Sequence, residues 1–424
     1  MTKDIQFLML LAVVALLFIT EMIPLAITAM GGAIACGLLG MVPVKTVFTG
    51  LANSTVVLFG GMFVVGAAMF HTGLAQTIGE KVVKLSGTGE KSLMFGIMTV
   101  GAVLSGFLSN TGTTACLMPV VLGICAAARL PASRQLLPLA YGVAFGGLFT
   151  IIGTPPNLIS SQALVAAGFK PFGFFEFGLI GVPIYIAGTA FMMFVGYRLL
   201  PKVEVSADTE VEQEFDVTVK DKTKQMISGL ILLAVVIVMA LDLKSVTLEM
   251  AAVIGAIICV LSVCLSEKQA YASIDWVTIF LFAGMMTVSK AMDTTGAGKL
   301  LAKACVEILG GSPTPLFVTG VLWIVSCVLT QFMSNTAATT LLAPIGIAIA
   351  SQIGASPHAV LMAITIGVGC AYATPVGTPP NTLVLGPGGY KFMDYVKVGT
   401  PLCVVSFIVS MLIIPLVWPF FPGK

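Results

Sequence analysis

The sequence has very little charge for its length. Of its 424 residues only 9% are Asp, Glu, Lys or Arg, whereas soluble domains carry about 25%. The chain is also 58% hydrophobic, with a mean hydropathy of +1.05. Because so few charged groups cannot cover a soluble surface, the composition excludes an ordinary soluble domain. The net charge of +2 offers no basic surface for nucleic acid.

Motifs for catalysis and metal binding are also missing. The chain has only two histidines, His71 and His358, and contains no H-E-x-x-H or G-x-S-x-G segment. Its nine cysteines occur singly, without a C-x-x-C pair. We interpret the cysteines as small apolar residues at helix contacts. The histidines are interpreted as interfacial, with a proton relay as the alternative. The sequence therefore predicts that the protein is not an enzyme.

Long apolar stretches recur along the whole chain. Continuous runs of this kind predict α-helices that cross a bilayer, whereas a membrane β-barrel would show short alternating segments. The first run, Ile5 to Thr20, is not followed by a small-residue cleavage site. We interpret it as a retained span and not as a signal peptide. The sequence predicts an all-α polytopic protein of the cell membrane.

The chain contains two copies of one unit. The segment FGGM at Phe59–Met62 matches FAGM at Phe282–Met285. The segments SNT at Ser109–Thr111 and GTPPN at Gly153–Asn157 each recur once, at almost the same separation along the chain. Because these landmarks keep their order and spacing, they indicate an internal duplication.

The duplication sets the expected domain boundaries. Each unit contains a hairpin around SNT and a helix broken at GTPPN. These features lie at about 92–128 and 136–167 in the first unit, 1–200, and at about 315–352 and 358–386 in the second, 226–424. A polar linker, 201–225, joins the two units.

The membrane topology depends on the segments around SNT. Flanks of about sixteen residues are short for spans, and re-entrant backbone is tolerated where it lines a cavity. We therefore expect re-entrant hairpins, which leave five crossings per unit and make the repeats inverted. Eight of the 21 Lys and Arg residues then lie on one side and thirteen on the linker side. This bias predicts a cytoplasmic linker, with both termini outside.

The chemistry of the polar clusters follows from interrupted helices. The first proline of GTPPN ends the preceding helix and frees carbonyls near Gly153 and Gly377. Thr154 and Thr378 are the expected N-caps of the next half-helix. Free carbonyls suit a small cation, and the start of a helix suits an anion. Neither cluster contains Lys or Arg, so a dianion bound there would need accompanying cations.

Inverted repeats with interrupted helices are typical of a binding site at the membrane midplane of a secondary transporter. The alternative is that SNT only caps tight turns and that the proline pairs only kink helices. A single copy of either motif would leave that alternative open. Two copies of each, equally spaced, favour a site.

Paired SNT motifs, each followed some forty residues later by GTPPN, resemble the divalent anion/sodium symporter family. Members of this family transport dicarboxylates, citrate and sulfate, and the resemblance covers essentially the whole chain. It implies a homodimer, with a scaffold domain and an elevator-like transport domain that carries two hairpins and two broken helices.

The resemblance also implies the ligands. A first Na⁺ site would be formed by Ser105, Ser109, Asn110 and the Gly153 carbonyl, and a second by Thr330, Met333, Asn335 and the Gly377 carbonyl. Substrate carboxylates would contact Ser109, Asn110, Thr111, Thr154 and Pro155 from one unit, and Ser334, Asn335, Thr336, Thr378 and Pro379 from the other.

We therefore expect sodium-coupled import of a small dianion, with a C4-dicarboxylate such as succinate, malate or fumarate favoured. The alternatives are a carrier of sulfate, another inorganic oxyanion or citrate, and a dicarboxylate exchanger that does not use sodium. A cation/proton antiporter would be expected to carry Asp or Glu at the breaks, and neither GTPPN has one. Five acidic residues near span ends are further candidates for proton coupling: Glu21, Asp242, Glu249, Asp275 and Asp293.

The charge map makes a labelling prediction. A cysteine introduced at Asp216, in the linker, should react with an impermeant thiol reagent in inside-out vesicles and not in intact cells. The unsubstituted protein, with its nine native cysteines, gives the background. Labelling in intact cells would reverse the orientation.

Overall fold

The computed structural model describes residues 2–85, 89–202, 221–241, 245–308 and 313–421, together with 243 and 310. Most of the predicted linker, 203–220, and Asp242 lie outside the described residues. The described part contains helices and no strand, which confirms the all-α prediction.

The first unit follows the predicted order of elements. Its helices are α1 (Lys3–Thr20), α2 (Leu25–Leu38), α3 (Ser54–His71), α4 (Leu74–Leu85), α5 (Glu90–Ser105), α6 (Asn110–Ala128), α7 (Leu136–Gly146), α8 (Pro155–Ala166), α9 (Gly178–Phe191) and α10 (Tyr197–Leu199). Short 3₁₀ turns η1 (Val44–Thr46), η2 (Thr49–Ala52) and η3 (Ala132–Arg134) precede α3 and α7, and a π turn η4 (Met192–Gly196) joins α9 to α10.

The second unit repeats this order. Its helices are α11 (Lys222–Ala240), α12 (Leu248–Leu261), α13 (Glu267–Ala272), α14 (Trp276–Thr295), α15 (Ala297–Ile308), α16 (Pro315–Leu329), α17 (Asn335–Gln352), α18 (Pro357–Gly369), α19 (Pro379–Leu385) and α20 (Phe392–Val417). The predicted hairpins correspond to α5–α6 and α16–α17. The predicted broken helices correspond to α7–α8 and α18–α19.

Six helical segments among the described residues are long and apolar enough to cross a membrane. They are Lys3–Thr20, Val44–His71, Asn110–Ala128, Gly178–Leu199, Lys222–Ala240 and Phe392–Val417. Four shorter apolar helices accompany them, namely α2, α12, α16 and α18. These helices agree with a multi-pass membrane protein.

The hairpin arms are less uniform than the sequence suggested. The first arms are short, with 16 residues in α5 and 15 in α16. The second arms have 19 residues in α6 and 18 in α17, because each begins within the SNT cluster itself. By its length α6 could cross a membrane, so the re-entrant arrangement stays a prediction.

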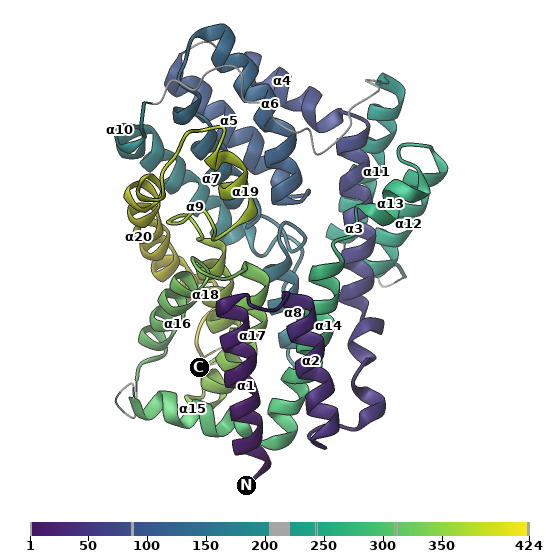
Figure 1. The fold of residues 1–424 in the computed structure, drawn as a ribbon, viewed down its shortest axis with the longest axis vertical. Helices are drawn as coiled ribbons and strands as arrows, with labels where there is room; N and C mark the ends of the chain where they lie inside the picture. Colours follow the sequence, from purple (N-terminus) through teal and green to yellow (C-terminus); the bar gives the residue numbers. More distant parts are fainter. Residues whose placement is uncertain are drawn as a thin grey trace.

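The helices fall into two packed groups (Figure 1). In one group α2 packs against α14, and α3 packs against α12, so each unit supplies one member of each pair. In the other group α5 packs on α7, α16 on α18, and α9 on α20. The amphipathic helices α4 and α15 lie at opposite ends of the molecule, with α4 at the top and α15 at the bottom.

Glycines of FGGM and FAGM allow close helix crossings in the first group. A Cβ at Gly61 in α3 would lie 2.7 Å from the carbonyl carbon of Ala252 in α12. A Cβ at Gly284 in α14 would lie 2.6 Å from the carbonyl carbon of Ala29 in α2. The two glycines are separated by the same length of chain as the two alanines. This recurring crossing explains why the motif occurs in both units.

We predict that Gly61→Ala lowers the melting temperature of the purified protein. The added Cβ would force the α3 and α12 backbones apart, an overpacking that costs about 1–3 kcal/mol. Gly60→Ala is the matched control, because nothing lies within 4 Å of its added Cβ. Equal melting temperatures for the two variants would show that the crossing is not close.

Candidate functional site

The SNT cluster forms the tip of each hairpin. Ser109 is the N-cap of α6 and accepts a hydrogen bond from the Gly112 N–H at 3.0 Å. Ser334 caps α17 in the same way and accepts from the Ala337 N–H at 3.2 Å. The serines therefore set where each second arm begins.

A hydroxyl–amide pair closes each tip. The Ser105 hydroxyl donates to the Asn110 side-chain oxygen at 2.5 Å. Thr330 donates to the equivalent oxygen of Asn335 at 2.7 Å. The structure thus brings together the hydroxyl and the amide expected at each cation site. The spacing between the two residues is the same in both units.

The asparagine of GTPPN holds each helix break together. The Asn157 amide donates to the carbonyls of Gly147 at 2.9 Å and Thr150 at 2.8 Å. Asn381 repeats these bonds in the second unit, with the carbonyls of Ala371 at 2.8 Å and Thr374 at 2.9 Å. Carbonyls that α7 and α18 leave unpaired are thereby satisfied.

Sequence reasoning placed neither asparagine in the site, and it also missed a threonine in each break. The Thr150 hydroxyl donates to the Gly106 carbonyl in the tip at 2.5 Å. Thr374 donates to the Gln331 carbonyl in the other tip at 2.7 Å. Both lie in a longer repeated pattern, T-x-x-G-T-P-P-N. Extending the repeat comparison upstream would have found them.

Each tip also lies directly against its own break. A Cβ added at Gly147 would lie 3.0 Å from both terminal atoms of the Asn110 amide. A Cβ at Gly153 would lie 2.6 Å from the Gly147 oxygen, and one at Gly377 would lie 3.1 Å from the Thr330 carbonyl oxygen. Glycine is needed here because the backbones and the tip side chains approach too closely for a side chain.

Thr154 and Thr378 occupy the expected N-cap positions, but their side chains make no capping hydrogen bond. The two prolines that begin each half-helix have no N–H. The next N–H, from Asn157, bonds to the Thr154 carbonyl at 3.1 Å. These helix starts therefore offer fewer N–H donors than the sequence predicts. An anion bound there would depend more on the unpaired threonine hydroxyls.

Several polar groups at the tips and breaks have no protein partner within the described part of the chain. They include the hydroxyls of Thr111, Thr336, Thr154 and Thr378, the amide NH₂ groups of Asn110 and Asn335, and the buried side-chain oxygens of Asn157 and Asn381. Ser109 is exposed, and Asn110, Thr111, Ser334, Asn335 and Thr336 are half-buried. Pro155 is half-buried and Pro379 is exposed, whereas Thr154, Thr378 and Met333 are buried. Within the described residues these groups therefore make no hydrogen bond that holds the fold.

The two breaks are neighbours in space. The Tyr141 hydroxyl of α7 donates to the Tyr372 carbonyl of the second break at 2.9 Å. Leu148 of the first break lies against the end of α18, where a Cβ at Gly369 would be 2.7 Å from its Cδ2 atom. The half-helix α8 packs on α17 and α18, and α19 packs on α6 and α7. Each half-helix thus reaches the hairpin of the other unit.

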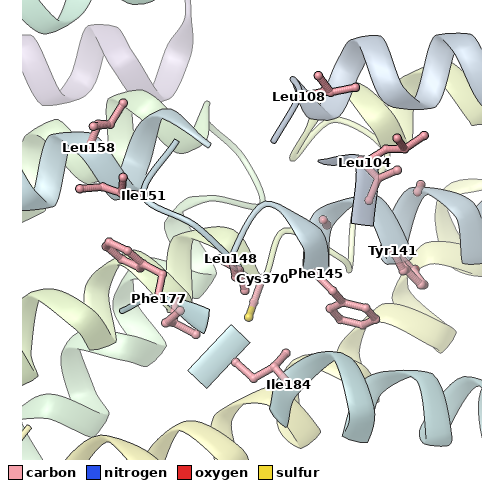
Figure 2. Close-up of a cluster of buried hydrophobic side chains, with 14 of the residues drawn as sticks. Leu104, Leu108, Tyr141, Phe145, Leu148, Ile151, Leu158, Phe177, Ile184 and Cys370 are labelled. Atoms are coloured by element: carbon pink, nitrogen blue, oxygen red, sulfur yellow. The ribbon is translucent and has the colours of Figure 1, made fainter. Parts of the chain in front are cut away.

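Apolar side chains surround the first break. Leu148 and Ile151 lie in the break, and Figure 2 shows them near Phe177 and Ile184 of the α9 region. All four side chains are almost fully buried. This packing encloses the carbonyls of the break among apolar side chains.

Within the described residues, the tips and breaks contain no charged side chain and no metal-binding cluster. No cluster of three His, Cys, Asp or Glu suited to a metal ion is found among the described residues. Among the acidic candidates, Glu21, Asp275 and Asp293 are exposed and Glu249 is half-buried. His358 contacts the Lys170 carbonyl through Nε2 at 2.9 Å, away from both breaks. The site consists of uncharged oxygen and nitrogen groups.

Comparison with known proteins now identifies the family. The citrate transporter family model matches residues 15–367 and 239–421. An uncharacterised transporter of Haemophilus influenzae is 31% identical, over 94% of this chain and 89% of its own length. The sodium-dependent dicarboxylate transporter SdcS of Staphylococcus aureus is 26% identical, over 97% of this chain and 85% of its own length.

Two solved structures share the fold. The Alcanivorax borkumensis YdaH transporter gives a TM-score of 0.64 at 18% identity and covers 90% of this chain and 87% of its own. Neisseria gonorrhoeae MtrF, from a class of antimetabolite efflux pumps, gives 0.63 at 15% identity and covers 100% and 97%. These likenesses concern the fold alone.

The fold and its relatives define a secondary membrane transporter, which confirms that the protein is not an enzyme. The chain belongs to the citrate transporter family, of the divalent anion/sodium symporter type. The resemblance drawn from SNT and GTPPN is thereby confirmed.

We predict that Asn110→Ala or Asn335→Ala reduces uptake to background while the protein still inserts and purifies. Each substitution removes an amide oxygen from a tip and an unpaired NH₂ from the ligand side. The matched control is Asn53→Ala, because Asn53 caps α3 by accepting from the Thr55 N–H at 2.8 Å, far along the chain from both tips. Normal uptake by well-expressed Asn110 and Asn335 variants would remove both residues from the site.

Proposed function

We propose that the protein is a sodium-coupled symporter of a small divalent anion, with a C4-dicarboxylate favoured. The observation that carries this proposal is the set of unpaired hydroxyl and amide groups repeated at both tips and breaks. Such groups are costly inside a membrane unless a ligand meets them. Their duplication supplies one cluster for each end of a molecule with two carboxylates.

The anion would be held without any fixed positive side chain. Neither SNT nor GTPPN contains Lys or Arg, so only partial charges of helix ends, hydroxyls and amide NH₂ groups face a carboxylate. At α8 and α19 the first two residues are prolines without an N–H, so these two helix starts offer fewer donors to an anion. A bound dianion would therefore depend on cations for most of its charge balance.

The oxygen groups at each tip fit a hard cation such as Na⁺. The first unit offers Ser105, Ser109, Asn110 and the Gly153 carbonyl, and the second offers Thr330, Asn335 and the Gly377 carbonyl with the main chain of Met333. Unwound carbonyls are a known means of coordinating Na⁺ in transporters. The Ser105 hydroxyl now points its hydrogen at Asn110. A cation would require that hydrogen to turn away, which exposes both oxygens.

The relatives support the sodium and dicarboxylate parts of the proposal. SdcS is named as a sodium-dependent dicarboxylate transporter and aligns along 97% of this chain. The tips and breaks of this chain therefore fall within the aligned region. The citrate description of the family favours citrate as the second candidate substrate. Dicarboxylates and citrate both present carboxylates to hydroxyl and amide donors. A direct comparison of their uptake is therefore needed to distinguish them.

The transport architecture extends the proposal. We place the two units in inverted orientation, each with five crossings, and the linker at the cytoplasmic side with both termini outside. The positions of α4 and α15 at opposite ends support the inversion (Figure 1). We also propose an elevator motion, as the family resemblance implies. A homodimer would supply the stationary scaffold.

We predict that succinate binding to the purified protein weakens at least tenfold when choline replaces sodium at constant ionic strength. Sodium bound at the tips supplies the charge that the side chains lack, so the dianion loses its counter-charge in choline. Equal dissociation constants in the two buffers would refute sodium coupling and favour an exchanger.

The same protein, reconstituted in proteoliposomes, shows which anion is transported. Uptake of labelled succinate, citrate and sulfate is compared with and without a sodium gradient. If Na⁺ carries net charge inward, uptake should also respond to membrane potential, which contributes about 2.3 kcal/mol per charge per 100 mV. Sodium-driven uptake of sulfate without succinate would replace the dicarboxylate assignment.

A further inference from the structure

The two hairpin tips, one at Ser109–Thr111 and one at Ser334–Thr336, differ at one nearby position. Gly106 in the first tip corresponds to Gln331 in the second when the two SNT motifs are aligned. Gln331 is buried, with 7% of its surface exposed. The second tip therefore carries a long amide side chain at a position where the first tip has a glycine. The breaks that these two residues face are built differently.

The first break closes on its own main chain. The Phe149 N–H donates to the Gly146 carbonyl at 2.9 Å, and the Leu148 N–H donates to the Phe145 carbonyl at 3.0 Å. Gly146 and Gly147 form the end of α7 and lie against the first hairpin: an added Cβ would come within 2.0 Å of the Ala102 carbonyl oxygen and 3.0 Å of the Asn110 amide, respectively. No side chain is required to pair these groups.

The second break is held open by the Gln331 amide. Ala373 and Cys370 correspond to Phe149 and Gly146 when the two GTPPN motifs are aligned. The Ala373 N–H donates to the Gln331 side-chain oxygen at 2.9 Å, and the Gln331 NH₂ donates to the Cys370 carbonyl at 3.1 Å. The side-chain amide therefore stands between the two groups that bond directly in the first break.

The remaining contacts of Gln331 fix its orientation. Its NH₂ also donates to the Cys327 carbonyl at the end of α16, at 2.8 Å. One N–H and two carbonyls surround the amide, so only one of its two flips satisfies all three. Its own carbonyl accepts from the Thr374 hydroxyl at 2.7 Å. Tip and break of the second unit are thus joined through both the side chain and the main chain of one residue.

Side chains from other helices add to this hold on the second break. The Cys403 thiol of α20 donates to the Cys370 carbonyl at 3.3 Å, and the Tyr141 hydroxyl donates to the Tyr372 carbonyl. Two separate helices therefore fix the unwound segment from outside. The first break has no counterpart of Gln331, and Leu148 stands where the second break has Tyr372.

We propose that Gln331 is a positioning residue that holds the second cation site in its binding geometry before any ligand arrives. A preorganised site binds with a smaller ordering cost, and the first site lacks the side-chain amide that joins tip to break in the second. The two sites are therefore unequal: Na⁺ occupies the site at Thr330 and Asn335 first. The site at Ser105 and Asn110 forms with the second Na⁺ and the anion. This inference rests on the sodium coupling proposed above.

The test is the sodium dependence of succinate binding in Gln331→Leu and Gln331→Met. Both substitutions leave the Ala373 N–H without its side-chain acceptor and remove the Gln331 hydrogen bonds to the buried carbonyls of Cys327 and Cys370, of which Cys370 keeps the Cys403 thiol and the Tyr372 N–H. We expect the sodium concentration for half-saturation to rise about tenfold, in line with the loss of such a buried network. Succinate affinity at saturating sodium should stay within about twofold of the unsubstituted protein.

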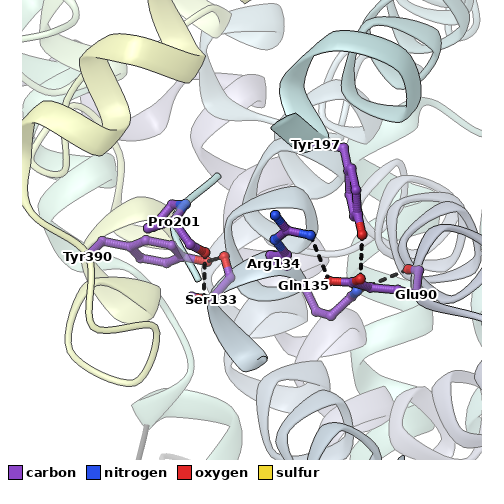
Figure 3. A network of polar contacts seen from close by, with 7 residues as sticks. All are labelled: Glu90, Ser133, Arg134, Gln135, Tyr197, Pro201 and Tyr390. Carbon is purple, nitrogen blue, oxygen red and sulfur yellow. Dashed lines mark hydrogen bonds and ion pairs between the residues drawn. The ribbon is translucent and has the colours of Figure 1, made fainter. Parts of the chain in front are cut away.

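Gln135→Leu is the matched control. Gln135 is also fully buried, and its NH₂ donates to the Glu90 carbonyl at 3.0 Å. Figure 3 shows it in a separate polar network with Arg134, Glu90 and Tyr197. We expect this variant to lower the melting temperature and to leave the half-saturating sodium concentration unchanged. A general loss of stability would instead affect all three variants alike.

The outcomes separate the inference from the proposed function. If the unsubstituted protein responds to sodium and the Gln331 variants respond identically, the inference is overturned and sodium coupling stands. If the unsubstituted protein ignores sodium, the coupling itself fails. Should both Gln331 variants fail to fold, hydrogen exchange of the unsubstituted protein decides. We expect 370–374 to be more strongly protected than 146–150 without sodium and this difference to shrink with sodium; equal protection without sodium would overturn the inference.

Discussion

Every interruption of a helix inside a membrane exposes backbone groups that lipid cannot pair, and this constraint governs the structure. The chain meets it at four places, two hairpin tips and two breaks, with polar side chains from within the same few residues. Asn157 and Asn381 pair the freed carbonyls, and Thr150 and Thr374 tie each break to its tip. Glycines let these backbones approach, and apolar side chains enclose them. We propose that the groups left unpaired bind the ligand.

The duplicated bonds also give the site its chemical character. In each unit one set of polar groups forms hydrogen bonds that stabilise the helix interruption, and a second set has no partner among the described residues. The remaining set contains hydroxyls, amides and carbonyls but no charge. In the proposed function, an anion and its cations would therefore bind in the same region, and coupling would require no titrating side chain. The exposed positions of Glu21, Asp275 and Asp293 agree with this view.

Much of this arrangement could be predicted from the sequence, because the duplication places short motifs at matching helix interruptions. The order of helices, the hairpin tips at SNT and the breaks at GTPPN all follow from local residues. The bonds that hold them do not, because Thr150 reaches back to Gly106 and Gln331 reaches forward to Cys370. Such pairs are set by packing between helices. Pro155 and Pro156 have no N–H, which is evident from the sequence. The prediction of free N–H groups at the start of this half-helix was therefore too high.

The most direct test of the account is an electron cryo-microscopy map of the protein in lipid, recorded once with sodium and succinate and once in choline. The account predicts compact density beside Asn110 and Gly153 and beside Asn335 and Gly377 in sodium, with elongated density between the two tips. In choline all three features should be lost. Succinate density away from the tips, or unchanged in choline, would contradict the claim that the unpaired groups of the two interruptions form one cation-dependent anion site.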